Sequence, residues 1–205
     1  MDITNIKWLG HASFRIEGPK VIYIDPFKIN PAISADIILI THSHFDHFSP
    51  EDINKIKTAD TFLIAPKDCQ INWKTEKRIV LIPDEKIDIE GIKIHAVSAY
   101  NTNKKFHPKT NNWVGYIIDI NEFKIYHAGD TDEIKEMENI DVDIALLPVG
   151  GTYTMDAKES ASALKKIKTK AVIPMHYGSI VGTEDAAIVL KNSTNINIII
   201  PEKSI

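Results

Sequence analysis

Short apolar segments rich in β-branched residues recur through the chain, and they constrain the fold more than any other feature. Gly, Pro, Asn or Asp bounds most of them, which is typical of strands. Strands dominate the first half, and strands alternate with helices in the second. This order predicts an α/β fold with two sheets packed face to face and covered by helices. The predicted strands are Ile6 to Leu9, Ser13 to Glu17, Val21 to Ile24, Ile37 to Thr41, Phe62 to Ala65, Ile79 to Ile82, Ile92 to Ser98, Gly115 to Ile120, Phe123 to His127, Ile144 to Leu147, Ala171 to Pro174 and Ile196 to Ile200.

Helix-start signals occur at three places between these strands. Ser49 is followed by Pro50 and by acidic residues, which predicts a capped helix after Ser49. Asp156 has Glu159 three residues on and predicts a second helix, and a third is expected to begin near Thr183.

The length and the composition exclude several classes of protein. With 205 residues, 43% of them hydrophobic, and no linker or repeat, we expect a single domain over residues 1–205. The apolar runs are far shorter than the roughly 20 residues that span a bilayer, so we expect no integral membrane protein. A net charge of −4 disfavours nucleic acid as a partner.

The compartment follows from two smaller observations. Asp2 stands where a signal peptide carries positive charge, and no apolar segment follows it. The single cysteine, Cys69, excludes an intrachain disulfide and a multi-cysteine zinc site. We therefore expect a cytoplasmic protein.

The segment from Thr41 to His47 carries the strongest chemical signal. It follows a buried strand and holds three histidines and a carboxylate within six residues. Side chains two apart in an extended segment project to the same side, so His42 and His44 converge on one ion while Asp46 and His47 turn toward another. Imidazole and carboxylate ligands suit Zn, Mn or Fe. The spacing predicts a site for two divalent ions, zinc before manganese or iron.

Two later strand ends carry matching ligands. Asp130 follows the strand Phe123 to His127, where Gly129 allows a tight turn and Asp130 can bridge two cations. His176 follows the strand Ala171 to Pro174. A Gly-Asp turn alone is typical of a loop, and a lone histidine is more often structural. Their occurrence together with the first cluster favours ligands in both cases.

These motifs resemble those of the metallo-β-lactamase superfamily. The segment from His42 to His47 is similar to its HxHxDH motif, Asp130 to its bridging aspartate and His176 to its late histidine ligand. The resemblance covers residues 6 to 182. Trp8 to Phe14 and Asp25 to Phe27 further resemble the branch with ascorbate-6-phosphate lactonases and N-acyl-phosphatidylethanolamine phospholipases.

The resemblance implies a four-layer αββα sandwich with the metals at one edge of the two sheets. It makes Asp25 a residue that orients a ligand. His11 either faces the active site or only begins a strand after Gly10. The implied ligands are His42 and His44 for the first ion, Asp46, His47 and His176 for the second, and Asp130 for both.

The chain departs from the family pattern after the strand Ile92 to Ser98. The family usually places a histidine there, but this chain has Asn101. His107 is the nearest downstream candidate and is preferred as the third ligand of the first metal. His95 lies inside the strand and is expected to be a packed or surface residue.

The expected function is hydrolysis of a small ester, lactone or phosphodiester by a metal-activated hydroxide. Asp46 would accept or relay a proton, and His11 is the second catalytic candidate. Neither a nucleophilic serine motif nor a P-loop is present. Alternatives are an RNA-processing phosphodiesterase or nuclease, a di-iron oxidoreductase and a metal-stabilised binding domain without turnover.

A lysine cluster bears on the substrate. Lys104, Lys105 and Lys109 surround His107 in the sequence and predict an anionic or phosphorylated small-molecule substrate. A solvated surface explains the same three lysines. Homo-oligomerisation is left open.

Overall fold

The protein is described here by a computed structural model that covers residues 1–30, 33–73 and 77–204. The chain forms two compact units: Met1–Leu81 with the end of the chain from Glu202, and Ile82–Pro201. A single domain over residues 1–205 stays a prediction. No helix within the described ranges is long and apolar enough to cross a membrane.

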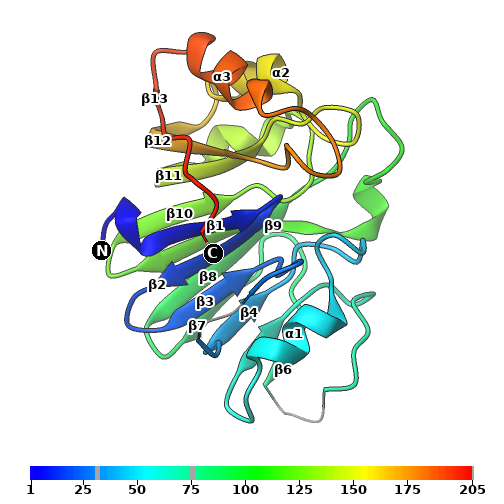
Figure 1. Cartoon of the computed structure of the whole chain (residues 1–205). Helices are drawn as coiled ribbons and strands as arrows, with labels where there is room; N and C mark the ends of the chain where they lie inside the picture. Colours follow the sequence, from blue (N-terminus) through cyan, green and yellow to red (C-terminus); the bar gives the residue numbers. More distant parts are fainter. Residues whose placement is uncertain (31–32, 74–76, 205) are drawn as a thin grey trace. The chain divides into compact units, whose positions relative to one another are not determined.

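The first unit is built on a mixed sheet of six strands in the order β1-β2-β3-β4-β5-β6 (Figure 1). β1 to β3 are antiparallel, whereas β3, β4, β5 and β6 run parallel. The carboxyl ends of β3 and β4 therefore meet at one edge. The strands are β1 (Ile6–Gly10), β2 (Ser13–Glu17), β3 (Val21–Ile24), β4 (Ile37–Leu39), β5 (Phe62–Ile64) and β6 (Arg78–Ile79), preceded by the 3-10 helix η1 (Ile3–Asn5).

Helix α1 (Pro50–Ile56) begins where the sequence predicts it. The Ser49 hydroxyl accepts a hydrogen bond from the backbone of Asp52 at the helix start. Ile53 and Ile56 of α1 are fully buried in a core that includes apolar residues of β3, β4 and β5. Cys69 lies in this core, and burial raises the pKa of its thiol.

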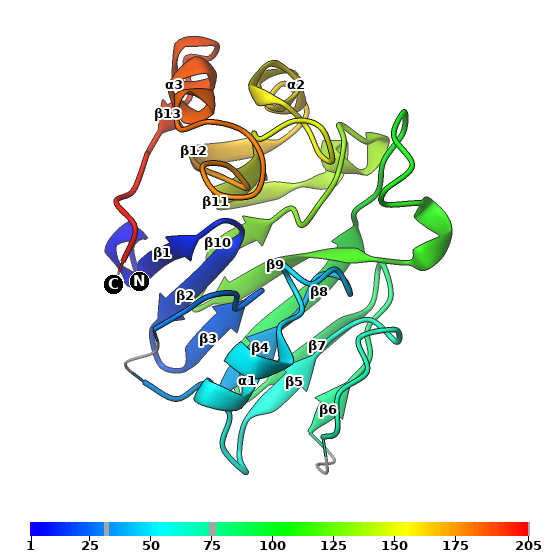
Figure 2. The same cartoon turned by 45° about the vertical axis from the view of Figure 1, so that its right-hand side comes forward.

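The second unit is built on a sheet of seven strands in the order β13-β12-β11-β10-β9-β8-β7 (Figure 2). β7 to β10 are antiparallel, whereas β10 to β13 run parallel. β8, β10, β11 and β12 therefore point their carboxyl ends to the same edge. The strands are β7 (Lys86–Ile89), β8 (Ile92–Ser98), β9 (Val114–Ile120), β10 (Phe123–His127), β11 (Asp141–Pro148), β12 (Lys168–Met175) and β13 (Asn197–Ile198).

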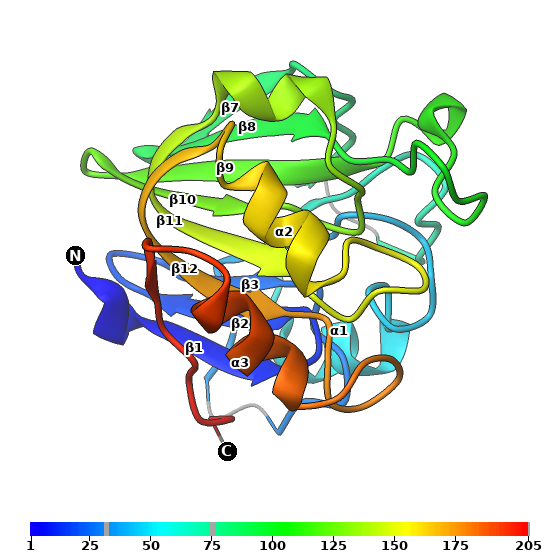
Figure 3. The same ribbon diagram turned by 90° about the horizontal axis from the view of Figure 1, so that it is seen from above.

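Two α-helices accompany the parallel part of this sheet (Figure 3). α2 (Ala157–Ala163) contacts β11, and α3 (Asp185–Asn192) contacts β12, β13 and α2. Asp156 and Glu159 form a reciprocal capping box at the start of α2, as the sequence predicts. The 3-10 helices are η2 (Lys109–Asn111) and η3 (Lys135–Asn139).

Several strand predictions need correction. The strand predicted over Ile79 to Ile82 is only β6, which ends at Ile79, and Val80 and Ile82 beyond it are 40% and 46% exposed. The strand predicted over Ile196 to Ile200 is only β13, and the strand predicted over Ile37 to Thr41 ends at Leu39. β7 was not predicted, since its alternation of Lys and Asp with isoleucine is polar on average. It forms because Ile87 and Ile89 turn inward while β7 pairs with β8.

Candidate metal centre

In the first unit, the predicted ligands lie at the joined carboxyl ends of β3 and β4. Asp25 directly follows β3, and Thr41 and His42 follow β4 within two or three residues. Because the two strands are parallel neighbours, the carboxylate of Asp25 reaches the start of the histidine segment. The sheet therefore brings together residues that are 16 positions apart.

Asp25 is fully buried and accepts three hydrogen bonds. Oδ1 accepts from the Thr41 backbone at 2.8 Å, and Oδ2 accepts from the Thr41 hydroxyl at 2.6 Å. His47 Nδ1 lies 2.7 Å from the same Oδ2, and the pair is completely buried. Since a carboxylate only accepts, His47 carries its proton on Nδ1.

A short relay fixes His42 in the same way. The Thr41 hydroxyl uses its proton for Asp25, so its oxygen accepts from His42 Nδ1 at 2.9 Å. His42 therefore also carries its proton on Nδ1. In both imidazoles the lone pair is on Nε2, which is the form that ligates a metal when Nδ1 donates to a protein oxygen.

The chain turns sharply after His44, so the extended segment predicted from the sequence needs correction. The Phe48 backbone donates to the His44 carbonyl at 2.8 Å, and the turn spans residues 45–47. It returns His47 to His42, whose ring centroids are 4.1 Å apart. His44 remains beside His42, with 3.1 Å between His44 Nδ1 and His42 Nε2.

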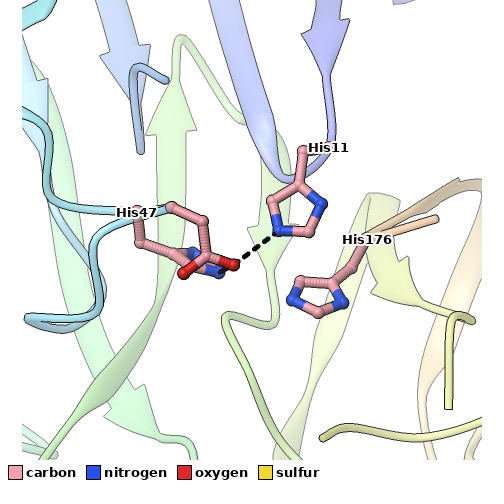
Figure 4. Close-up of side chains that lie close together, drawn as sticks. His11, His47 and His176 are labelled. Carbon is pink, nitrogen blue, oxygen red and sulfur yellow. Dashed lines mark hydrogen bonds and ion pairs between the residues drawn. The ribbon is translucent and has the colours of Figure 1, made fainter. Parts of the chain in front are cut away.

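His11 lies on the tight turn between β1 and β2 and faces Asp46. His11 Nε2 is 2.9 Å from Asp46 Oδ2, and both side chains are largely buried. A dashed line marks this contact of the labelled His11 in Figure 4. His11 has a φ of 53°, which a non-glycine residue adopts at a cost of about 1 kcal/mol or more. The Trp8 indole donates to the His11 carbonyl at 2.9 Å and holds this turn.

In the second unit, the predicted ligands lie at the edge to which β8, β10 and β12 point. His107 is in the loop after β8, Asp130 follows β10, and His176 follows β12. All three are at least 96% buried. Asp130 Oδ2 is 3.2 Å from His107 Nε2 and 3.1 Å from His176 Nε2. The Asp130 carboxylate therefore lies close to both imidazoles.

Asn101 positions His107. Its Oδ1 accepts from the His107 backbone at 2.9 Å and from His107 Nδ1 at 3.1 Å. Its amide nitrogen donates to the Tyr153 carbonyl and to Asp132. Asn101 thus directs His107 Nε2 toward Asp130. The ligand role of His107 stays a prediction.

His176 is held by close backbone packing. It has a φ of 59°, and a Cβ on Gly150 would overlap its carbonyl oxygen. A Cβ on Gly182 would in turn lie 2.7 Å from the Gly150 Cα. Only glycine at both positions allows this approach.

The predicted lysine cluster is largely engaged in ion pairs. Lys104 Nζ is 2.7 Å from Asp132 Oδ1, and Lys109 Nζ is 2.8 Å from Glu136 Oε1. Burial alone would raise the pKa of Asp132, but Lys104 and two backbone donors hold it below its usual value. Lys105 is exposed. The anionic substrate therefore stays a prediction.

His95 lies in a groove of about 630 Å³ that is lined mainly by residues of β7, β8 and β9. The residues that line this groove include none of the predicted ligands. His95 is half-buried, and burial followed by the nearby Lys86 lowers its pKa. The sequence expectation of a packed or surface strand residue is confirmed.

The residues present fit divalent metal ions. Each unit contributes buried imidazoles beside a buried carboxylate, and His42, His47 and His107 all have Nδ1 directed at a protein oxygen. This leaves Nε2 as the basic nitrogen, an arrangement that is usual for metal-ligating histidines. The donors suit zinc, manganese or iron.

Comparison with known proteins defines the class. The family model "Beta-lactamase superfamily domain" matches residues 5–176. The chain is 36% identical to a UPF0173 metal-dependent hydrolase of Thermococcus onnurineus, covering 86% of each chain. It is 40% identical to one of Thermoplasma volcanium, over 87% of this chain and 85% of that relative.

A crystal structure of a candidate metal-dependent hydrolase from Parabacteroides distasonis has a TM-score of 0.85 and 34% identity, covering 97% of this chain and 93% of that one. The chain has the metallo-β-lactamase fold predicted from its sequence. It belongs to the β-lactamase superfamily and, within it, to the UPF0173 metal-dependent hydrolases.

Proposed function

We propose that this protein binds two divalent ions through the ligand sets of its two units and hydrolyses a small ester, lactone or phosphodiester. The observation that carries the proposal is that Nδ1 of His42, His47 and His107 each hydrogen-bonds to a protein oxygen, which leaves Nε2 to bind metal. Family membership supports the use of both sets together. The further resemblance of the N-terminal segments to lactonases and phospholipases supports the substrate range.

The proposed ligands are divided between the ions as the family resemblance implies. Divalent ions would lower the pKa of water and polarise a substrate oxygen. Zinc is the first candidate. The ligands are His42, His44 and His107 for the first ion, Asp46, His47 and His176 for the second, and Asp130 for both.

The chain's own residues have three tasks in this reaction. Asp25 and Asn101 hold imidazoles in the ligating tautomer. The Asp46 carboxylate, in contact with His11 Nε2, accepts the proton that the attacking water gives up and returns it to the leaving oxygen. The products are then an alcohol with either a carboxylate or a phosphate monoester.

The experiment is a substrate panel with a matched pair of histidine variants. Metal-free protein is reloaded with Zn²⁺, Mn²⁺ or Fe²⁺ and assayed on an aryl ester, a lactone, an aryl phosphodiester and a thioester. We expect His107→Ala to lose turnover by about 100-fold or more, since a ligand is removed. His95→Ala, which removes a histidine of the same unit outside the ligands, retains it.

Two results would contradict the proposal. One is turnover of the wild-type protein that survives complete removal of metal. The other is an equal loss of turnover in His107→Ala and His95→Ala. Such a result would mean that the substitutions disturb the fold and that His107 has no specific role as a metal ligand.

A further inference from the structure

An exposed phenylalanine stands between two proposed ligands of the first unit. Phe45 separates His44 from Asp46 and is 69% exposed, the highest value among the exposed large hydrophobic residues of the described chain. It occupies the turn at residues 45–47, where Gly, Asn, Asp or Ser are the usual residues. Because the ring is so exposed, it adds little to the core. The fold alone does not explain an aromatic residue at this place.

A second ring fixes the position of Phe45. Its ring centroid is 5.9 Å from that of Phe27, at an interplanar angle of 78°. Phe27 is itself 6.3 Å from the His11 ring in an edge-to-face arrangement. Such edge-to-face pairs are favourable and orient both rings. The rings of Phe45, Phe27 and His11 thus form a row that leads from the exposed Phe45 to the buried His11, whose Nε2 contacts the Asp46 carboxylate.

The second unit repeats the pattern with different residues. Phe106 directly precedes His107 and is 39% exposed, whereas His107 is buried. The Phe106 ring lies 4.8 Å from the Tyr153 ring at 87°. Tyr153 also accepts, through its carbonyl, the amide of Asn101 that positions His107. An exposed ring held edge-to-face therefore adjoins the proposed ligands in each unit independently.

Two of the lysines near these rings are paired with carboxylates: Lys104 with Asp132 and Lys109 with Glu136. Lys28 Nζ lies 5.1 Å from the Phe27 ring centroid, and Lys105, next to Phe106, is exposed. Because Lys104 and Lys109 are paired, the surface beside Phe106 is more apolar than the lysine-rich sequence around His107 indicates.

We infer that Phe45 in the first unit and Phe106 in the second each contribute to substrate specificity by binding an apolar part of the substrate, aryl or acyl and at least the size of a phenyl ring, beside the proposed ligands of their own unit. This inference rests on the proposed function, since the group is placed by the metal ligands. It favours apolar esters and lactones over small phosphorylated metabolites. A phenyl group against these rings gains edge-to-face contact and loses exposed apolar surface.

The test measures binding and does not need turnover. The metal-loaded protein is titrated calorimetrically with phenylacetate and with acetate, which offer the same carboxylate with and without a phenyl ring. We expect phenylacetate to bind at least fivefold more tightly. In Phe45→Ala and in Phe106→Ala this preference should fall about 2- to 10-fold, the usual range for an aromatic pair.

Controls separate specificity from a disturbed ligand set. Phe45→Leu keeps an apolar side chain and should restore part of the preference. Val80→Ala truncates an exposed apolar residue of the first unit outside the ligands and should leave the preference unchanged. Metal content is measured for every variant, so that a lost ion is recognised.

The outcomes distinguish this inference from the proposed function. An unchanged phenylacetate preference in both alanine variants overturns the inference, as does a wild-type protein that binds acetate or glycerol phosphate as tightly as phenylacetate. Absence of measurable phenylacetate binding also overturns it. If any of these occurs while the protein still binds metal and hydrolyses a panel substrate, the proposed function stands without it.

Discussion

Replacing Asp25 by Asn tests how the first unit prepares its ligands. The amide keeps one oxygen for the Thr41 backbone but presents NH₂ to His47 Nδ1, where the wild-type carboxylate accepts at 2.7 Å. His47 can then accept at Nδ1 only by moving its proton to Nε2, the nitrogen proposed to ligate metal. We expect metal affinity to fall about 10- to 100-fold, as for other residues that orient metal ligands.

The same substitution also affects stability without metal. Oδ2, which the amide nitrogen replaces, accepts two buried hydrogen bonds, from the Thr41 hydroxyl and from His47 Nδ1. A buried hydrogen bond to a charged group contributes about 1.5–3 kcal/mol, so losing both lowers the free energy of unfolding by about 3–6 kcal/mol. For a chain of 205 residues this lowers Tm by about 6–24 °C. Asp25→Ala leaves all three donors without an acceptor, and a loss of about 3–9 kcal/mol is expected.

The assay combines chelator competition for Zn²⁺ with urea unfolding of the metal-free protein. Asp36→Asn is the matched control, since Asp36 also accepts a backbone hydrogen bond, from Val21 at 2.7 Å, but contacts none of the proposed ligands in the described residues. We expect wild-type metal affinity in Asp36→Asn. Wild-type affinity in Asp25→Asn would refute the assignment of the His47 tautomer and of the role of Asp25.

Three further predictions concern other parts of the chain. Gly150→Ala should displace His176 and lower metal affinity at least tenfold, measured by the same competition, because the new Cβ overlaps the His176 carbonyl. Asp52→Asn should cost about 1–3 kcal/mol in urea unfolding at pH 7. Burial alone would raise the pKa of Asp52, but hydrogen bonds from donors including Lys55 lower it overall. The ionised carboxylate therefore stabilises the fold above the unfolded-state pKa, and this stability is lost on acidification. The difference in free energy of unfolding between Asp52→Asn and wild type should narrow toward about pH 3. Lys105→Gln tests the anionic substrate predicted from the sequence against the apolar substrate inferred from Phe45 and Phe106. We expect equal effects on KM for a phosphorylated substrate and for its neutral analogue, and a larger rise for the phosphorylated one would contradict the apolar preference.

Much of the fold follows from local sequence signals. β2, β3, β8 and β10 have the predicted bounds, because alternating or continuous apolar residues end at clear turn residues. Ser49 and Asp156 cap the helices that they predict in the sequence. Local chemistry decides these features, so one sequence is enough to predict them.

The ligand candidates were predictable for a similar reason, whereas the residues that hold them were not. Asp130 and His176 follow strands of one sheet that point to a common edge, and His42 follows β4 of the other sheet. The hydrogen bonds by which Thr41 connects Asp25 to His42 depend on the tertiary packing of two strands. No local pattern in the sequence indicates such a link.

Loop geometry sets the other limit on prediction. The orientation of His107 by Asn101 depends on how the loop after β8 closes. His11 and His176 have a positive φ, which is uncommon for residues other than glycine, and surrounding contacts maintain it. Such departures from local preference are common at functional sites.

The number of metal ions per chain tests the central claim that both ligand sets act together. Elemental analysis of purified protein, reloaded with Zn²⁺ and freed of excess metal, should give two ions per chain for wild type. Asp130→Ala and His42→Ala, one from each unit, should both lose bound metal and hydrolysis together while keeping the wild-type circular dichroism spectrum. Unchanged metal content in both variants would contradict the account.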